Sequence, residues 1–110
     1  MTLPFNKIIC GSAIDVLKET IPDNSIDLVV TSPPYDTIRT YEELIGGLVK
    51  KYNGYSFPFE QIAIELYRVM KKGGVIVWVV GDAVIAGSET GSSFRQALFF
   101  KELGILLLSL

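Results

Sequence analysis

Histidine and cysteine are the scarcest functional residues of this sequence. Its 110 residues include no histidine and a single cysteine, Cys10. One cysteine cannot build a disulfide framework, and its scarcity fits the reducing cytoplasm, where we expect the protein to act. Since no histidine is present to activate its thiol, Cys10 is expected to be a small buried hydrophobic residue, and no metal site is predicted.

The sequence also lacks a strong charge of one sign and any long hydrophobic run. Ten lysines and arginines against twelve aspartates and glutamates give a net charge of −2, which excludes a polybasic protein that wraps nucleic acid. No apolar run reaches the roughly 18 residues that a membrane span requires. Residues 1–6 have neither a basic flank nor a long apolar stretch, so no signal peptide is predicted.

What the sequence does contain is enough apolar surface for one small globular domain. Hydrophobic residues make up 49% of the chain and charged residues 20%. A chain of this length buries about 65% of the surface that its unfolded state exposes. We therefore expect one domain over residues 1–110, because low hydrophobicity with high charge is what keeps a chain disordered.

Short apolar runs alternate with helical patterns along the chain. The predicted strands are residues 7–10, 26–31, 75–80 and 105–110. The runs at 26–31 and 75–80 are almost continuously apolar, which is typical of strands buried on both faces of a parallel sheet. Strands that alternate with helices indicate βαβ units, so the predicted fold class is α/β.

Helix starts and stops are marked by capping residues. Ser12 with Asp15, and Ser93 with Gln96, have the spacing of a capping box, in which two side chains satisfy free amides at a helix start. The helix that begins at Ser93 is expected to end before Gly104, because glycine tolerates the left-handed C-cap conformation.

The central helix has the clearest apolar face. Its members recur at helical spacing and are Phe59, Ile62, Ala63, Leu66, Tyr67 and Met70. Lys71 and Lys72 are expected in its last turn, against the negative end of the helix dipole, before Gly73 and Gly74 end it. Residues 41–51 are a further candidate helix in a less regular stretch.

The most specific motif follows the strand at residues 26–31. Its residues are Ser32, Pro33, Pro34 and Tyr35, and ligands of open α/β sheets bind outside the carboxyl ends of strands. Two prolines fix two φ angles and remove two N–H donors, which leaves rigid carbonyls, one hydroxyl and an aromatic ring. Such a site suits a planar amino group, whose two N–H groups would be accepted by Ser32 and a proline carbonyl while Tyr35 stacks on the ring. The alternative is an ordinary proline-containing turn.

These residues resemble the amino-group DNA methyltransferases, which use S-adenosylmethionine. Ser-Pro-Pro-Tyr at residues 32–35 is the form typical of enzymes that methylate the exocyclic amine of cytosine, whereas adenine enzymes more often carry aspartate. Residues 24–31, 65–74 and 87–97 are similar to further segments of the family, so the resemblance covers residues 7–104.

The resemblance implies a reaction, a cofactor and a partner. S-adenosylmethionine would donate the methyl group, and double-stranded DNA would present a flipped target base. Ser32, Pro33, Pro34 and Tyr35 would be catalytic, and the cofactor would be bound by Ser12, Ala13 and Ser32. The residues expected to contact DNA phosphates are Arg39, Lys50 and Lys51, with an ordinary solvated face as the alternative.

The resemblance also implies what this sequence does not contain. It has no Phe-x-Gly-x-Gly cofactor loop and no target-recognition region, so we expect a partial Rossmann-like methyltransferase sheet with flanking helices. Strands of the complete sheet would lie between residues 7–10 and 26–31, and without them apolar surface and unpaired backbone groups would be exposed. The expected partner is then the missing C-terminal part or a second copy. Two further interpretations are an adenine-N6 methyltransferase and a truncated, non-catalytic remnant.

Two other segments have mainly structural interpretations. Asp82 follows a strand and is a minor candidate for cofactor or base contact. The loop at residues 87–93 is expected to be a plain loop and helix cap, with contact to the DNA backbone as its alternative. Cys10 lies in a predicted strand, and the sequence has no histidine to activate it. Its expected role as a small buried residue argues against methylation of the cytosine ring carbon through a cysteine nucleophile.

Overall fold

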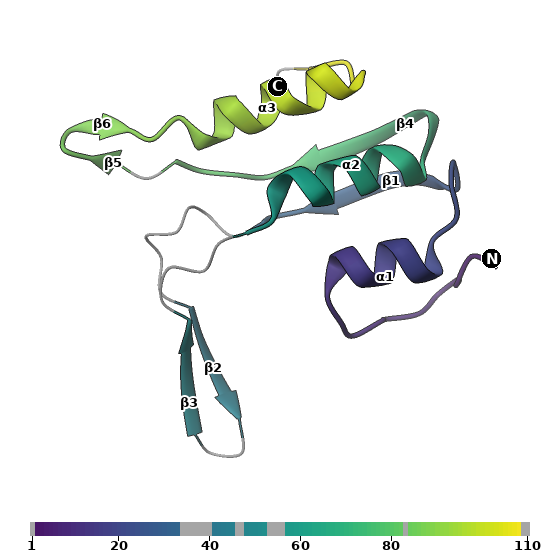
Figure 1. The fold of residues 1–110 in the computed structure, drawn as a ribbon, viewed down its shortest axis with the longest axis horizontal. Helices are drawn as coiled ribbons and strands as arrows, with labels where there is room; N and C mark the ends of the chain where they lie inside the picture. The colour runs from purple at the N-terminus through teal and green to yellow at the C-terminus, as the bar shows by residue number, and fades with distance from the viewer. Residues whose placement is uncertain (1, 34–40, 46–47, 53–56, 83, 109–110) are drawn as a thin grey trace.

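A computed structural model describes residues 2–33, 41–45, 48–52, 57–82 and 84–108 (Figure 1). The elements in chain order are α1 (Ala13–Thr20), β1 (Ile26–Thr31), β2 (Tyr41–Ile45), β3 (Leu48–Tyr52), α2 (Phe59–Val69), β4 (Met70–Trp78), β5 (Val84–Ile85), β6 (Ser88–Glu89) and α3 (Ser92–Leu103).

The centre of the structure is a pair of parallel strands, β1 and β4. Their register places Leu28 opposite Val75, Val30 opposite Val77 and Thr31 opposite Trp78. Parallel neighbours need a crossover connection, and α2 lies in the stretch of chain between them. The predicted α/β class is therefore confirmed.

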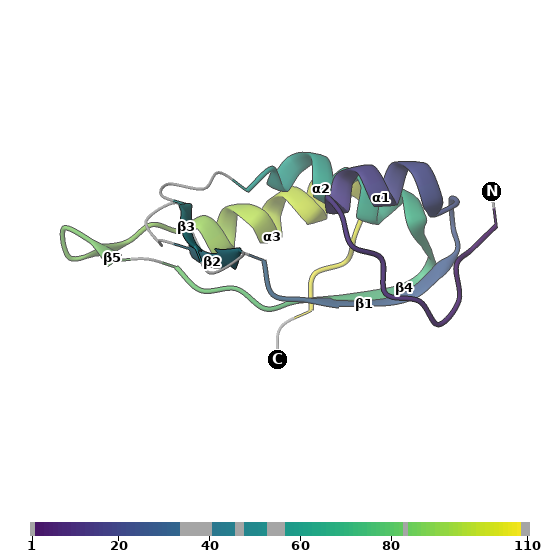
Figure 2. The same ribbon diagram turned by 90° about the horizontal axis from the view of Figure 1, so that it is seen from below.

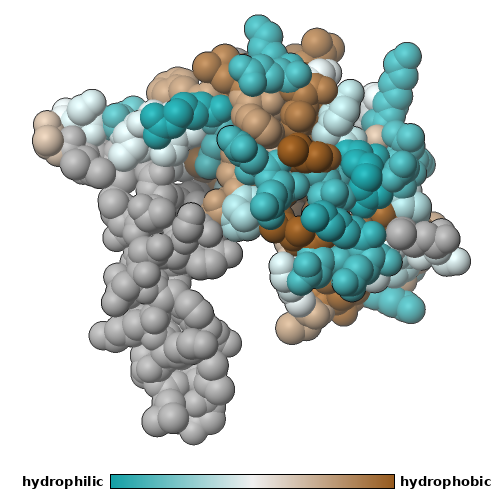
Figure 3. Space-filling model, in the orientation of Figure 1, coloured by the Kyte–Doolittle hydropathy of each residue, from teal (hydrophilic) through white to brown (hydrophobic). Residues whose placement is uncertain are grey.

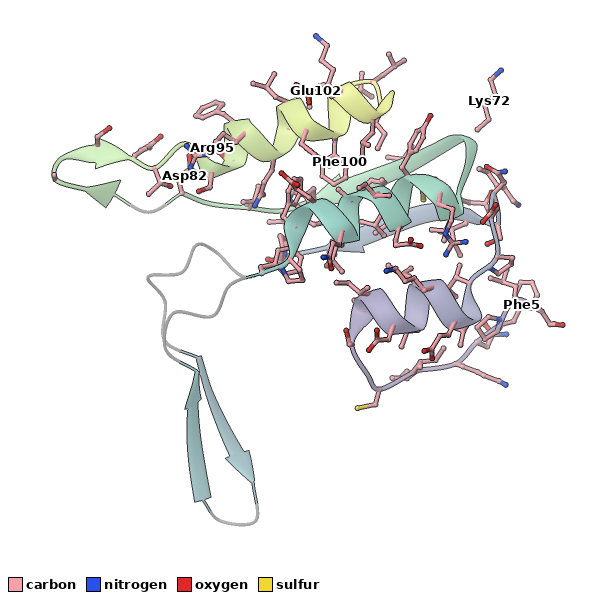
Figure 4. The ribbon with its side chains drawn as sticks, in the orientation of Figure 1. Phe5, Lys72, Asp82, Arg95, Phe100 and Glu102 are labelled. Carbon is pink, nitrogen blue, oxygen red and sulfur yellow. The ribbon has the colours of Figure 1, made fainter. Side chains whose placement is uncertain are left out.

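All three helices lie on the same side of the β1–β4 sheet, as Figure 2 shows. Helix α2 packs against the sheet through its apolar face, and this face forms most of the core. The buried apolar residues are Ile62, Ala63, Leu66, Val69, Met70 and Phe100. Tyr67, which the sequence placed on the same face, is instead exposed. Figure 4 shows Phe100 reaching from α3 toward α2, so α3 closes the core from a second side.

The opposite face of this sheet is uncovered. Its exposed side chains alternate along both strands and are Leu28, Val30, Val75, Val77 and Val79. The near-continuous apolarity of β1 and β4 predicted burial on both faces of the sheet. This prediction is wrong for the described residues, because they cover only one face.

The two terminal strand predictions are wrong for the described residues. Residues 7–10 and 105–108 have no strand assignment, and Ile8 is exposed to solvent. Cys10 is exposed too, so its predicted burial is also wrong. A strand exists only when a neighbour accepts its backbone hydrogen bonds. Within the part of the chain that the structure describes, β1 pairs with β4 alone, so neither segment has a partner.

Two small hairpins lie outside the central sheet. β2 pairs with β3 and β5 pairs with β6, both antiparallel. The predicted helix over residues 41–51 is therefore wrong. The sequence carries Gly46 and Gly47 in the middle of this segment, and paired glycines weaken a helix interior and favour a hairpin turn.

The helix before β4 ends earlier than its composition suggests. Met70 already has extended φ and ψ of −72° and 135°, so Lys71 and Lys72 lie in β4 rather than in the last helical turn. The register between β1 and β4 shifts between Ile26 and Leu28, whose partners are Met70 and Val75. Gly73 lies between these two partners in β4 and adopts a φ of +86°. The last-turn cation is Arg68.

Arg68 joins α2 to the preceding helix. Its guanidinium donates to the backbone oxygens of Leu17 and Ile21 at 2.7 and 3.0 Å, so it caps the carbonyls at the end of α1. It also forms ion pairs with Asp23 and Glu65, both at 2.6 Å. The hydrogen bond that Arg68 donates to Asp23, and then the one it donates to Glu65, raises the pKa of Arg68 above its ordinary value. One side chain thus links α1, the following turn and α2.

Candidate functional site

The ends of several elements meet at one end of the molecule. β1 and β4 both finish there, and α1, α2 and α3 all begin there (Figure 1). Strand carboxyl ends and helix amino ends bring backbone donors and acceptors to the same edge, which is where ligands of open α/β sheets bind. Any ligand site of this fold is therefore expected at this edge.

Ser32 and Pro33 lie at the carboxyl end of β1. Thr31 is opposite Trp78, and its carbonyl accepts a hydrogen bond from the Val79 amide at 2.9 Å. Ser32 is exposed and Pro33 is buried. The strand pair therefore anchors the chain up to Thr31, and Pro33 seats the loop on the protein while Ser32 stays open to solvent. Pro34 and Tyr35 lie outside the described residues.

The amino end of α1 contributes the residues expected to bind the cofactor. Ser12 is the N-cap, and both Ser12 and Ala13 are exposed. Ser12 makes no side-chain capping hydrogen bond, so the predicted capping box with Asp15 is wrong, although the helix does begin where predicted. The first amides of any α-helix have no partner within the helix. These amides and the Ser12 hydroxyl are polar groups at the start of α1, and the prediction that this end binds a cofactor remains a prediction.

The loop after β4 is held by Asp82. Its carboxylate accepts hydrogen bonds from the Ser93 amide at 2.7 Å and from the Ser93 hydroxyl at 2.9 Å. Figure 4 shows Asp82 and Arg95 beside the first turn of α3. The predicted capping box of Ser93 with Gln96 is wrong, because Gln96 accepts a hydrogen bond from the Trp78 indole at 3.0 Å instead. Asp82 thus caps α3 from a distance of eleven residues, a pairing that no local spacing in the sequence signals.

An aromatic cluster lies behind this edge, between α2, α3 and β4. Trp78 and Phe59 meet edge to face with ring centroids 5.7 Å apart, and Phe100 contacts both rings. An open cavity of about 340 Å³ borders the cluster and is lined by Phe57, Phe59, Glu60, Ser92, Arg95, Gln96 and Phe99. Trp78 sits opposite Thr31 in the register, so this cluster supports the strand end that carries Ser32.

The structure places the predicted site residues on different elements. Ser12 and Ala13 lie at the start of α1, and Ser32 and Pro33 follow the carboxyl end of β1. Arg39 lies outside the described residues. The backbone of Lys50 and Lys51 lies in β3, in a hairpin that pairs with none of the other strands described.

The surface over the helices is of mixed character. Figure 3 shows hydrophilic residues gathered over α1 and α2 and apolar residues over α3. The exposed apolar residues of α3 are Phe94 and Leu98. Lys72 projects at the end of the molecule opposite Asp82 (Figure 4), so it is far from the edge that carries Ser32.

Membrane-spanning helices and clusters of metal ligands are both absent from the described ranges. None of the helices traced there is both long and apolar enough to cross a bilayer. No group of potential metal ligands comes together among these residues.

Comparison with known proteins gives a consistent result. The sequence model of a family described as DNA methylase, which covers N6 and N4 methyltransferases, matches residues 26–110. The orphan methyltransferase M.BamHII of Bacillus amyloliquefaciens is 63% identical over 91 residues, which is 83% of this chain and 30% of that protein. The type II methyltransferase M.BglII of Bacillus subtilis is 34% identical over 108 residues, which is 91% of this chain and 26% of that protein.

A third relative shows the same partial coverage. The type II methyltransferase M.HpaI of Haemophilus parainfluenzae is 38% identical over 81 residues, or 73% of this chain and 24% of that protein. The chain therefore spans less than a third of the length of the curated relatives it matches. No solved structure gives a significant match.

Proposed function

Because this chain belongs to the DNA methylase family, we propose that it carries the methyl-transfer motif of an enzyme that methylates the exocyclic amine of cytosine in DNA. The observation that supports this most directly is the position of Ser32. It is exposed at the carboxyl end of β1, next to a buried proline and at the edge where helix amino ends converge. Membership of this family implies S-adenosylmethionine as the methyl donor.

Ser32 and Pro33 supply hydrogen-bond acceptors to the target amine. The Ser32 hydroxyl oxygen and the Pro33 carbonyl oxygen would each accept one N–H bond. Holding both hydrogens draws the nitrogen lone pair out of conjugation with the ring and aims it away from the two acceptors. Positioning and electrostatics of this kind supply most of the rate when no strong base or nucleophile is needed. Pro34 adds rigidity to the loop, and Tyr35 would stack on the flipped base.

Cofactor and DNA contacts follow from the same arrangement. When bound, S-adenosylmethionine supplies an electrophilic methyl group. Ser12 and Ala13 at the start of α1 would hold one edge of it, and Ser32 would lie near its reactive part. Arg39, Lys50 and Lys51 would contact phosphates of double-stranded DNA.

The isolated chain is proposed to have no methyltransferase activity. Its proposed location is the cytoplasm. It spans 30% of M.BamHII, and the sequence has no glycine-rich cofactor loop. Residues 1–110 would be the catalytic portion of a Rossmann-like methyltransferase domain whose cofactor loop and target-recognition region are supplied elsewhere.

A chimaeric enzyme tests the catalytic assignment. The stretch of M.BamHII that matches this chain is replaced by the chain, and methylation of DNA is measured with labelled S-adenosylmethionine. Digestion of the product to nucleosides separates N4-methylcytosine from N6-methyladenine. We expect N4-methylcytosine, and N6-methyladenine would favour the adenine interpretation, which the family equally allows.

Two variants of the chimaera test the role of Ser32. Ser32→Ala removes one of the two proposed acceptors and is expected to lower the rate by about 10²-fold or more. Ser88→Ala is the matched control, because Ser88 is exposed in the β5–β6 hairpin. A Ser32→Ala chimaera with near-normal activity would remove Ser32 from the mechanism.

A truncated, non-catalytic remnant is the second candidate, favoured by the short span relative to M.BamHII. Calorimetry of the 110-residue chain with S-adenosylmethionine separates the two cases. Sub-millimolar binding would refute an inert remnant, whereas an inactive chimaera without cofactor binding would support it.

A further inference from the structure

The ring of Trp78 is held in one orientation by a hydrogen bond. Its indole nitrogen, on β4, donates to the side-chain oxygen of Gln96 on α3 at 3.0 Å. An indole N–H can only donate, so the acceptor has to be the oxygen of the amide. Phenylalanine would supply packing without a polar group, whereas a paired polar group among aromatic rings specifies one arrangement. The Trp78 ring is therefore oriented as well as packed.

The backbone of Trp78 meets the end of β1. Thr31 is its partner in the parallel register, and the Thr31 carbonyl accepts a hydrogen bond from the Val79 amide at 2.9 Å. Ser32 is the next residue of the chain, and Pro33 after it is buried. The position of Trp78 therefore determines where the chain leaves the sheet.

The side chain of Trp78 meets the chain again at the start of α2. The centroid of its ring lies 6.2 Å from that of Phe57 and 5.7 Å from that of Phe59. The Phe59 amide donates to the Phe57 carbonyl at 2.8 Å, so these two aromatic residues belong to one short turn. Residues 34–56, which begin with Pro34 and Tyr35, lie between the two contacts in the sequence. One tryptophan thus contacts both ends of this stretch.

We propose that Trp78, oriented by Gln96, is a positioning residue for methyl transfer, because it fixes both ends of the segment that carries the proposed catalytic motif. The inference rests on the proposed function of Ser32. Trp78 contacts neither the target amine nor the cofactor and acts through Thr31 and Phe57. Misplacing a group at the reacting atoms by about 1 Å can cost about 10²-fold in rate, so turnover is the sensitive quantity.

Core packing alone is the competing explanation of the Trp78–Gln96 pair. Phe100 also packs on the indole, with ring centroids 5.2 Å apart, and is only 7% exposed. A purely structural role predicts that loss of the hydrogen bond lowers the folded fraction and leaves the turnover of each folded molecule unchanged. A positioning role predicts a loss of turnover that remains after correction for the folded fraction.

Amide hydrogen exchange of the 110-residue chain tests the anchoring without any methylation assay. Gln96→Leu removes the acceptor at a similar side-chain volume. The amides of Val79 and Phe59 report the two anchored ends, and the Ser25 amide, bonded at the far end of the strand pair, is the internal reference. We expect Val79 and Phe59 to exchange at least about fivefold faster relative to Ser25.

Turnover of the M.BamHII chimaera tests the consequence for methyl transfer. Gln96→Leu and Trp78→Phe each remove the hydrogen bond and should each lower kcat by about tenfold, with the KM for DNA changed by less than about twofold. The double variant should lose no more than either single variant, since both delete one interaction. Gln96→Glu keeps an acceptor oxygen at the same reach and should restore most of kcat. Circular dichroism at the assay temperature gives the folded fraction that corrects each rate.

The matched control is Gln61→Leu. Gln61 is exposed in the first turn of α2, so the same substitution is made on a helix surface away from the indole. Exchange of the Val79 and Phe59 amides and the kcat of the chimaera should both stay as in the unmodified protein.

Three results would overturn the inference. The first is unchanged exchange of Val79 and Phe59 in Gln96→Leu, and the second is a kcat that returns to normal once corrected for the folded fraction. The third is an equal loss of kcat in Gln96→Glu. An unmodified chimaera without activity would count against the proposed function instead, and the exchange rates would then decide alone whether Trp78 anchors both ends.

Discussion

Removing the guanidinium of Arg68 is expected to detach α1 from the rest of the structure. Arg68 donates to the carbonyls of Leu17 and Ile21 and to the carboxylates of Asp23 and Glu65. Lysine has a compact charge and no planar fork, so Arg68→Lys keeps the charge and loses most of this geometry. Arg68→Ala loses all four bonds.

The magnitude follows from the exposure of each partner. Hydrogen bonds from a charged donor contribute about 1.5–3 kcal/mol when buried, and the 27% exposure of the Arg68 side chain lowers this to about 1 kcal/mol for each carbonyl. Asp23 is 69% exposed, so its ion pair contributes at most about 0.5 kcal/mol. We expect Arg68→Ala to lower the free energy of unfolding by about 2–3 kcal/mol and Arg68→Lys by about 1–2 kcal/mol.

Urea unfolding followed by circular dichroism measures both losses. With a slope of about 1.5 kcal/mol per molar urea, Arg68→Ala should lower the urea midpoint by about 1.3–2 M. Amide hydrogen exchange adds a local readout, because amides of α1 should exchange faster while those of α3 do not. Arg95→Ala is the matched control, since Arg95 is exposed and its side chain donates a long hydrogen bond to Ser92 at 3.4 Å.

The pH dependence has a definite sign. Since the pKa of Arg68 is raised in the folded protein, its contribution is complete at every pH below the ordinary arginine value and is lost only in stronger alkali. The difference between Arg68→Ala and the unmodified chain should therefore be constant from about pH 6 to pH 10. A loss below about 0.5 kcal/mol, or an equal effect of Arg95→Ala, would refute the proposed role of Arg68 in holding α1.

Two further substitutions test the ends of α3. Asp82→Ala removes both hydrogen bonds to Ser93, so urea unfolding should show a free energy of unfolding about 1–2 kcal/mol lower. Asp82→Asn should lower the free energy of unfolding by less, and equal losses in the two variants would contradict capping by the carboxylate. Gly104→Ala forces a side chain onto a backbone with a φ of +112° and should lower the melting temperature by several degrees, whereas an unchanged value would show that the C-cap relaxes at no cost.

Local patterns predicted the elements that carry the site. Continuous apolar β-branched residues marked Ile26–Thr31, and helical periodicity with a terminal glycine marked Ser92–Leu103 to within one residue. These signals are strong because burial and capping act within a few residues of chain. The position of Ser32 at the end of a strand was predicted for the same reason.

Several of the errors concern interactions between distant residues. Residues 7–10 have the composition of a strand, but pairing depends on a neighbour that lies elsewhere in the chain or in another polypeptide. The cap of α3 comes from Asp82, and the anchor of α1 comes from Arg68. A sequence read locally can find the residues that need partners, and it cannot tell which partners the fold supplies.

The proposed catalytic loop and the uncovered face of the sheet meet on one strand. Ser32 directly follows β1, and the exposed side chains of Leu28 and Val30 belong to the same strand. Hydrogen bonds to a target amine orient it most strongly in a site from which water is excluded. An active enzyme that contains this strand would therefore have to exclude water from the end of β1 for Ser32 to act as proposed.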